Sequence, residues 1–155
     1  MKIVDILNKD AILVDLKSID KKGVLEELVT PVAGAAGINP EDLVRVLMER
    51  ERLGSTGIGG GIGIPHGKMK DLESMVIGFG LSRKGVDFES MDGQPTHIFF
   101  LLITPENSTG LHLKLLSRIS RILKNDSFKE KLLNATGRDE IFDIIQEEEE
   151  ELSNV

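Results

Sequence analysis

The chain of 155 residues contains no cysteine, tryptophan or tyrosine, and its aromatic side chains are six phenylalanines. The absence of cysteine excludes disulfide bonds, thiolate catalysis and cysteine-ligated zinc or iron–sulfur sites. The shortage of aromatic rings removes the stacking platforms on which single-stranded nucleic acids usually bind. Composition alone therefore excludes disulfide scaffolds and thiol enzymes, and it disfavours single-strand binding.

Positive charge is also in short supply. The 19 Lys and Arg residues are outnumbered by 26 Asp and Glu residues, which gives a net charge of −7. The basic residues are spread along the chain instead of forming a stripe, as binding to a phosphate backbone would require. We therefore expect no nucleic-acid partner, whereas a modestly acidic surface suits protein partners that present basic patches.

Long apolar runs are missing as well. No stretch approaches the roughly 20 residues of a transmembrane helix, and residues 1–5 lead into no apolar region of the kind found in signal peptides. We expect a soluble cytoplasmic protein without direct membrane insertion. With 40% hydrophobic residues, a chain of this length can bury one core, so we expect a single domain over 1–155.

The apolar periodicity predicts strands in the middle of the chain, with helices before and after them. The predicted elements are a strand at 11–16, a helix from 20 that ends at Gly34 and Gly37, a helix from Asn39 to 53, a glycine-dense loop, strands at 75–81 and 97–103, and helices at about 109–124, 126–134 and from Gly137 onward. This order favours an α/β or α+β layered domain, in which helices pack against a small sheet. The acidic segment 146–155 is expected to be a solvated, frayed helix end, because its glutamates oppose the helix dipole.

The glycine-rich segment from Gly54 to Gly67 is the densest signal, with seven of the sixteen glycines in fourteen positions. A dinucleotide fingerprint fails in every register, and a P-loop fails because Met69 follows Lys68 where Ser or Thr is required. Nucleotide binding is therefore disfavoured. The glycines instead suggest a backbone that must approach another group closely.

Within this segment, Ile62, Ile64 and His66 alternate with glycine and proline, as on a short strand whose apolar face ends in an imidazole. Pro65 fixes the backbone before the imidazole, and Gly67 is expected to permit an unusual turn after it. The pattern predicts that His66 is presented at an edge. A histidine that only satisfies a backbone carbonyl is the plainer alternative.

Arg50 falls in the middle of an apolar stripe on the helix that begins at Asn39. Stepping 100° per residue places it between Leu47 and Leu53, whereas Arg52 projects to the polar side. A core-facing arginine is costly to bury unless an anion pairs with it, although a side chain near a helix end can also reach solvent. Arg50 is therefore a candidate anion binder.

His112 projects to the centre of the apolar face of the helix that begins near Thr109. It lies in the first turn, where free N–H groups and the helix dipole favour an anion, with Ser108 and Thr109 as candidate caps. If the fold brings His66, Arg50 and His112 together, they provide a nucleophilic imidazole, a bidentate anion binder and a second donor. A satisfied core histidine is again the plainer alternative.

A metal site made from His66, His97 and His112 is less favoured. No pair of these histidines has the i, i+4 spacing of helical ligands, and no H-E-x-x-H motif accompanies them. His97 opens an apolar strand, which indicates a structural role. We expect neither a metal nor a cofactor.

The sequence resembles the type-2 IIA domains of the phosphoenolpyruvate-dependent phosphotransferase system, which include fructose, mannitol and nitrogen-regulatory branches. The resemblance covers essentially the whole chain and rests on the motifs at 50–53, 54–58, 63–67, 92–95 and 111–113. It implies a mixed sheet flanked by helices. The amino-acid sequence of residues 54–59 is most similar to that of the stand-alone nitrogen-regulatory branch.

The resemblance also implies a function, in which the phosphocarrier HPr phosphorylates His66 and both Arg50 and His112 assist. The loop residues that it implies for phosphoryl binding are Ser55, Thr56, Gly57 and Gly67. In the regulatory branch, phosphorylation governs which target proteins are bound; in a sugar-specific branch, the phosphoryl group passes to a IIB component. A small-ligand binding domain is the alternative if no phosphohistidine forms.

The expected chemistry is that of a neutral imidazole, whose reference pKa of about 6.5 leaves it nucleophilic near neutral pH. We expect Nε2 of His66 to attack while a backbone carbonyl of the glycine loop holds Nδ1–H. An arginine and a histidine donor can match the charge on a transferring phosphoryl group without a metal.

Overall fold

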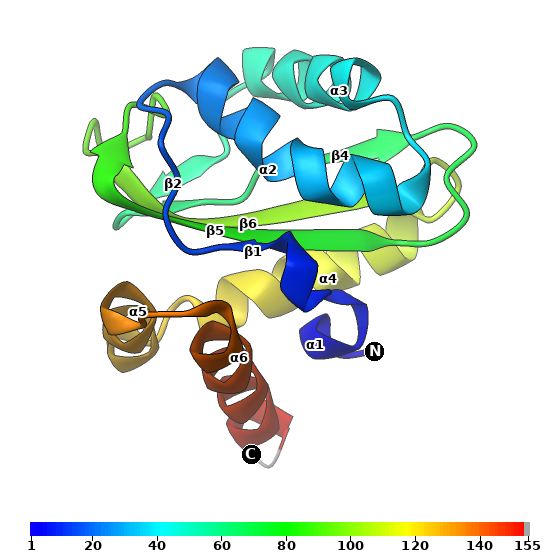
Figure 1. Ribbon diagram of the computed structural model, residues 1–155. Helices are drawn as coiled ribbons and strands as arrows, with labels where there is room; N and C mark the ends of the chain where they lie inside the picture. Colours follow the sequence, from blue (N-terminus) through cyan, green and yellow to red (C-terminus); the bar gives the residue numbers. More distant parts are fainter. Residues whose placement is uncertain (154–155) are drawn as a thin grey trace.

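The computed structural model describes residues 1–153 as a mixed sheet between two layers of helices (Figure 1). The helices are α1 (Ile3–Ile6), α2 (Lys21–Ala36), α3 (Pro40–Arg52), α4 (Thr109–Ile122), α5 (Asp126–Asn134) and α6 (Arg138–Ser153), with a 3-10 turn at Lys9–Ala11. The strands are β1 (Ile12–Leu13), β2 (Gly57–Gly59), β3 (Ile62–Gly63), β4 (His66–Met69), β5 (Val76–Val86) and β6 (Thr96–Pro105). None of the helices within 1–153 is long and apolar enough to cross a membrane.

The sheet has the order β1-β5-β6-β3-β2, and β4 also pairs with β6. β5 and β6 are antiparallel, whereas β1 runs parallel to β5, and both β3 and β4 run parallel to β6. The two apolar runs in the middle of the sequence are the central strands β5 and β6, mostly buried on both faces. The predicted mixed sheet flanked by helices is confirmed.

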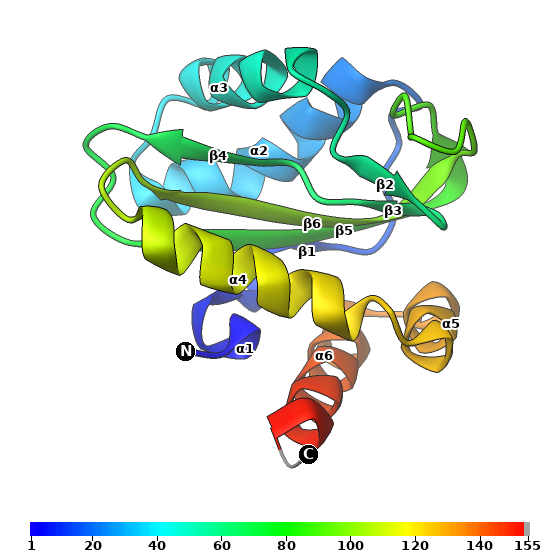
Figure 2. The same cartoon turned by 180° about the vertical axis from the view of Figure 1, so that it is seen from behind.

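The side chains of β6 alternate between two cores because successive residues of a strand point to opposite faces. Phe99 lies in the core under α2 and α3, where its ring meets Phe88 edge-on at 5.1 Å. Phe100 lies in the core formed with α1, α4, α5 and α6, where it meets Phe79 in the same way. Figures 1 and 2 show these two helical layers on opposite faces of the sheet.

The helices α2 and α3, which cover the face of the sheet that carries Phe99, both begin at residues that are typical of helix caps. The side chain of Asp20 accepts a hydrogen bond from the backbone N–H of Gly23 at the start of α2, and Asn39 caps α3 in the same manner. α2 ends at Gly37, whose φ of 68° is left-handed, while Gly34 lies inside the helix. The expected strand at 11–16 is shorter, since β1 covers only Ile12–Leu13.

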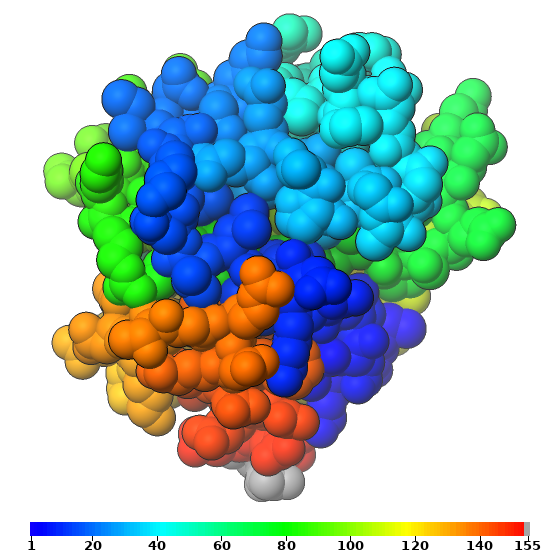
Figure 3. Space-filling view, viewed as in Figure 1, coloured from blue at the N-terminus to red at the C-terminus, as the bar shows by residue number. Residues whose placement is uncertain are grey.

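The expected frayed tail at 146–155 is wrong for the residues that the structure describes. α6 continues to Ser153, and Glu149 is fully buried. Its carboxylate accepts hydrogen bonds from the backbone N–H groups of Ile3 (2.7 Å) and Val4 (3.0 Å) and pairs with Nε of Arg118 at 2.6 Å. This carboxylate thus joins α1 to the C-terminal helix α6, and these two helices lie side by side in Figure 3. Residues 154–155 lie outside the described part.

Candidate functional site

The edge of the sheet beside β6 carries His66. β3 and β4 both pair with β6, and His66 stands opposite Leu102 at the start of β4. Ile62 and Ile64 are each 4% exposed and belong to the core on the α4 side, whereas His66 is only half-buried. The predicted apolar face is confirmed, but the expected single strand is divided into β3 and β4, with residues 64–65 outside both. β4 lies between α3 and α4 in Figure 2.

Gly67 does not form the expected unusual turn, because it lies within β4. Three glycines with left-handed φ, Gly59 (95°), Gly60 (67°) and Gly61 (80°), instead turn the chain from β2 into β3. A Cβ on Gly67 would lie 2.9 Å from Cγ1 of Val46. The missing side chain therefore allows α3 to pack closely on the strand that carries the histidine.

The ring of His66 is held in one orientation. Its Nδ1 lies 2.7 Å from the backbone oxygen of Ile64, the kind of contact expected from the sequence. Because a carbonyl oxygen only accepts, Nδ1 carries the proton and Nε2 keeps its lone pair. Burial lowers the pKa of His66 below its ordinary value, the Ile64 carbonyl opposes this, and the charge of Arg50 lowers the pKa further. The imidazole is therefore neutral and nucleophilic near neutral pH.

His112 lies in the first turn of α4 and faces His66. It is 5% exposed, and the two ring centroids are 5.5 Å apart. Its Nδ1 lies 2.6 Å from the hydroxyl oxygen of the buried Thr104. Burial, followed by the nearby charges of His66 and Lys68, lowers the pKa of His112 to about 4. His112 is therefore also neutral near neutral pH.

The expected caps of α4 are wrong in detail. Ser108 occupies the N-cap position, but its side chain makes no capping hydrogen bond. The hydroxyl of Thr109 instead accepts a hydrogen bond of 2.9 Å from Nζ of Lys68. Lys68 lies on β4, the same strand as His66, and this contact brings its ammonium group to the start of α4.

Arg50 lies in the last turn of α3 and is partly exposed. One guanidinium nitrogen donates to the backbone oxygen of Gly54 at 3.0 Å, and within 1–153 no carboxylate forms an ion pair with it. By contrast, Arg45 is paired with Asp42 at 2.7 Å. Leu53 does not share the buried stripe, since it is 84% exposed. The guanidinium of Arg50 thus has donors left for an anion near His66.

The loop hydroxyls expected to bind a phosphoryl group are occupied by protein contacts. The hydroxyl of Ser55 donates to the backbone oxygen of Phe88 at 2.9 Å and accepts from the N–H of Gly57 at 3.0 Å. The hydroxyl and the N–H of the buried Thr56 both bond to the carboxylate of Glu51. These side chains fix the loop after α3.

Sequence reasoning missed Glu51, Lys68 and Thr104. Glu51 follows Leu47 by four residues, so helical spacing places it beside the apolar stripe and gives a weak signal. No sequence pattern indicates that Thr104 meets His112, because that contact joins a strand to a helix across a turn. Lys68 shares a strand face with His66, which the alternation along β4 could have indicated.

The arrangement is suited to an anion. Within residues 1–153, no group of three or more His, Cys, Asp or Glu side chains is placed to hold a metal ion. His97 bonds to the backbone oxygen of Ser82 and takes no part in the site. A neutral nucleophile, a neutral imidazole and cationic groups can together receive a phosphoryl group.

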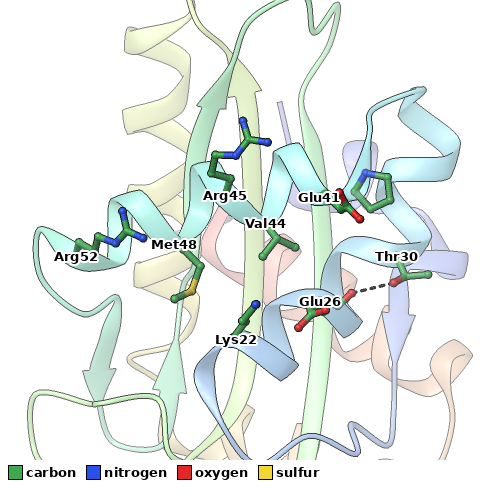
Figure 4. Close-up of a pocket in the computed structure, with 9 residues that line it drawn as sticks. Lys22, Glu26, Thr30, Glu41, Val44, Arg45, Met48 and Arg52 are labelled. Atoms are coloured by element: carbon green, nitrogen blue, oxygen red, sulfur yellow. Dashed lines mark hydrogen bonds between the residues drawn. The ribbon is translucent and has the colours of Figure 1, made fainter.

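A surface hollow of about 600 Å³ lies between α2 and α3 (Figure 4). It is lined by Lys22, Glu26, Thr30, Pro40, Glu41, Val44, Arg45, Met48 and Arg52. His66, Arg50 and His112 are not among its lining residues. The reactive groups lie instead at the sheet edge.

Comparison with known proteins gives consistent matches. Residues 5–148 match the family described as the phosphoenolpyruvate-dependent sugar phosphotransferase system, EIIA 2. The chain is 40% identical to the nitrogen regulatory protein of Bradyrhizobium diazoefficiens, over 94% of this chain and 95% of that protein. It is 39% identical to the fructose-specific EIIABC component of Bacillus subtilis, over 95% of this chain but only 23% of that protein. The crystal structure of IIA-Ntr from Neisseria meningitidis superposes with a TM-score of 0.88 at 33% identity, covering 92% of this chain and 98% of that chain.

Proposed function

Because the chain belongs to the EIIA 2 family of the phosphoenolpyruvate-dependent sugar phosphotransferase system, we propose that it is a phosphocarrier whose His66 accepts a phosphoryl group from an HPr-type protein. The observation that carries this proposal is the hydrogen bond from Nδ1 of His66 to the Ile64 carbonyl. It leaves Nε2 as the nucleophilic nitrogen of a neutral ring. The edge position of His66 on β4 leaves the ring half-buried and within reach of a partner protein.

The phosphoryl transfer needs no cofactor to balance its bonds, electron pairs and proton. The lone pair on Nε2 of His66 forms the new P–N bond, while the P–N bond of the donor phosphohistidine breaks and its electron pair returns to the donor ring. The proton on Nδ1 of His66 stays in place, where the Ile64 carbonyl stabilises the positive charge that the ring acquires. No hydroxide, metal or nucleotide enters this step.

Cationic and neutral donors then stabilise the charge on the equatorial oxygens of the transferring group. Arg50 supplies guanidinium N–H groups from α3, and Lys68 supplies an ammonium from β4. His112 donates from Nε2 when the Thr104 hydroxyl donates to its Nδ1, since the neutral ring then carries its proton on Nε2. The loop residues Ser55, Thr56 and Gly57 contribute by fixing the backbone around these groups.

We propose a nitrogen-regulatory role, in which phospho-His66 changes the proteins that this surface binds. The relative from Bradyrhizobium diazoefficiens, which matches along 95% of its own length, supports this branch. The added negative charge would alter contacts with partner groups close to the histidines. The alternative is a sugar-specific role, supported by the match to the fructose-specific EIIABC component, in which the phosphoryl group passes to a IIB component.

The test is phosphorylation with purified enzyme I, HPr and phosphoenolpyruvate. We expect acid-labile, base-stable labelling of the wild-type protein and none of His66→Ala, with His97→Gln as a matched control that is labelled normally. Labelling of His66→Ala at the wild-type level would contradict the site. Release of the label to a purified fructose-type IIB component would favour the sugar-specific role over the regulatory one.

A further inference from the structure

A buried carboxylate holds the loop between α3 and β2. Glu51, the residue after Arg50, is 6% exposed although it is charged. Its Oε1 accepts the backbone N–H of Thr56 at 3.0 Å, and its Oε2 accepts the Thr56 hydroxyl. The backbone N–H and the hydroxyl of Thr56 are therefore both bound by one side chain that the mechanism above does not use.

The charge of Glu51 is balanced by Lys21 at the start of α2. Nζ of Lys21 lies 3.0 Å from Oε1 of Glu51, 2.9 Å from the exposed Glu89, and over the ring of Phe88 at 5.0 Å. Burial lowers the pKa of Lys21, but the two carboxylates outweigh this and raise it above the ordinary value. Lys21 is therefore charged, and it makes the burial of Glu51 tolerable.

A continuous set of hydrogen bonds leads from this pair to the reactive histidine. Thr56, held by Glu51, accepts the backbone N–H of Ile64 on its own carbonyl oxygen at 3.0 Å. The carbonyl of Ile64 in turn accepts Nδ1–H of His66 at 2.7 Å. The position of Thr56 thus sets the position of the group that orients the imidazole.

The same loop also orients Arg50. The backbone N–H of Gly54 donates to the carbonyl of Glu51 at 3.0 Å, while the carbonyl of Gly54 accepts from the Arg50 guanidinium at 3.0 Å. Gly54 has a φ of 146°, which is unfavourable for other residues, so this junction is locally specified. The loop between α3 and β2 therefore bonds to Arg50 directly and is linked to His66 through Ile64.

We propose that Glu51, anchored by Lys21, is a positioning residue for phosphoryl transfer, because it holds the loop between α3 and β2, which bonds to Arg50 through Gly54 and supports His66 through Thr56 and Ile64. This inference rests on the proposed function. It assigns Glu51 no contact with the phosphoryl group. A residue of purely structural value would change the stability of the fold without changing the geometry of the reacting groups.

The kinetic test compares Glu51→Ala and Glu51→Gln with Glu49→Ala, an exposed glutamate on the same helix. Single-turnover transfer is followed at increasing concentrations of phosphorylated HPr. Small displacements of reacting groups cost up to about 10²-fold in rate. We therefore expect Glu51→Ala to lower the maximal rate at least about 10-fold. The concentration of HPr that gives half of the maximal rate should rise by a much smaller factor. Glu51→Gln, which keeps an oxygen for the Thr56 N–H, retains more activity, and Glu49→Ala is unchanged.

A spectroscopic test reads the histidine directly, by ¹⁵N NMR of protein labelled in its imidazole rings. The wild-type spectrum should show His66 protonated on Nδ1, and Glu51→Ala should show a mixture of tautomers. Since the charge of Glu51 raises the pKa of His66, His66 should titrate at a lower pH in Glu51→Gln than in the wild type. Glu49→Ala should match the wild type in both respects.

The outcomes separate the two proposals. A folded Glu51→Ala protein with the wild-type rate and tautomer overturns the positioning role. If that variant does not fold, Glu51→Gln and Thr56→Val replace it, and wild-type values of rate, tautomer and His66 pKa in both variants overturn the role equally. Failure of the wild-type protein to accept a phosphoryl group refutes the proposed function, whereas the NMR comparison still decides whether Glu51 orients His66.

Discussion

The imidazole rings of His66 and His112 lie with their centroids 5.5 Å apart and their planes tilted by 56°. Each ring has its Nδ1 bound to a different partner, the Ile64 carbonyl for His66 and the Thr104 hydroxyl for His112. The two partners differ in kind, because a carbonyl only accepts whereas a hydroxyl can donate. The surroundings of the two rings are therefore asymmetric, which fits the proposed roles of nucleophile for His66 and donor for His112.

The first prediction concerns the role of His112. If it donates to the phosphoryl oxygens, His112→Gln should retain much more transfer than His112→Ala, because an amide keeps a donor of similar reach. Mass spectrometry of the intact protein under non-acidic conditions should find one added phosphoryl group on the wild type. Two added groups would mean that His112 is itself an acceptor.

A second prediction follows from the Thr104 hydroxyl. Thr104→Val preserves the shape of the buried side chain but removes the group bound to Nδ1 of His112, so the neutral ring no longer has a fixed tautomer. We expect slower transfer, with a loss smaller than that of His112→Ala. Equal rates for Thr104→Val and the wild type, at matched stability, would show that the hydroxyl does not set the donor.

The third prediction compares two arginines of α3. Arg50→Ala should lower the transfer rate by about 10²-fold or more, as is common when a contact to developing charge is lost. Arg52→Ala should have little effect, because Arg52 is exposed and lines the hollow between α2 and α3. The comparison requires that both variants remain folded by circular dichroism, and equal rates would remove Arg50 from the site.

The fourth prediction is a pH dependence of stability. His112 has its pKa lowered to about 4 in the folded protein, whereas an unfolded histidine titrates near 6.5. Below about pH 6.5 the unfolded state binds a proton at His112 that the folded state does not bind. The contribution of His112 to the free energy of unfolding should therefore fall as the pH drops from about 6.5 towards 4, and it should be constant above that range. The contribution is of the order of 3 kcal/mol. In His112→Gln this part of the slope should disappear, and an unchanged slope would contradict the assignment.

The fifth prediction tests the buried end of α6. Glu149→Ala leaves Arg118 and two N–H groups of α1 without their shared anion, which should lower the free energy of unfolding by about 3–5 kcal/mol. Glu147→Ala changes an exposed member of the same acidic run and should change the free energy by less than about 0.5 kcal/mol. Chemical denaturation of the two variants measures the difference, and equal midpoints would indicate that the run is solvated throughout.

Much of the fold could be predicted because it depends on local periodicity. β5 and β6 are long apolar runs, α3 has an Asn-Pro start, and His66 ends an alternating segment. These signals require no knowledge of distant residues. Arg50 and His112 are predicted site residues for the related reason that each interrupts an apolar helix face.

The remaining features depend on contacts between distant segments. The burial of Glu149 depends on its contact with α1, where its partner Ile3 is 146 positions away in the sequence. The strand conformation of Gly67 reflects its pairing with Ile103 of β6, and a glycine would equally suit a turn. The role of Thr56 depends on Glu51 and Lys21 meeting beneath the loop. A single sequence does not reveal such partners.

The most direct test of the central claim is the site of the P–N bond, measured by ¹⁵N–³¹P coupling in protein labelled in its histidine rings and phosphorylated through HPr. We predict one phosphohistidine, with phosphorus bonded to Nε2 of His66 and the proton retained on Nδ1. Phosphorus on Nδ1 of His66, or on His112, would contradict the account.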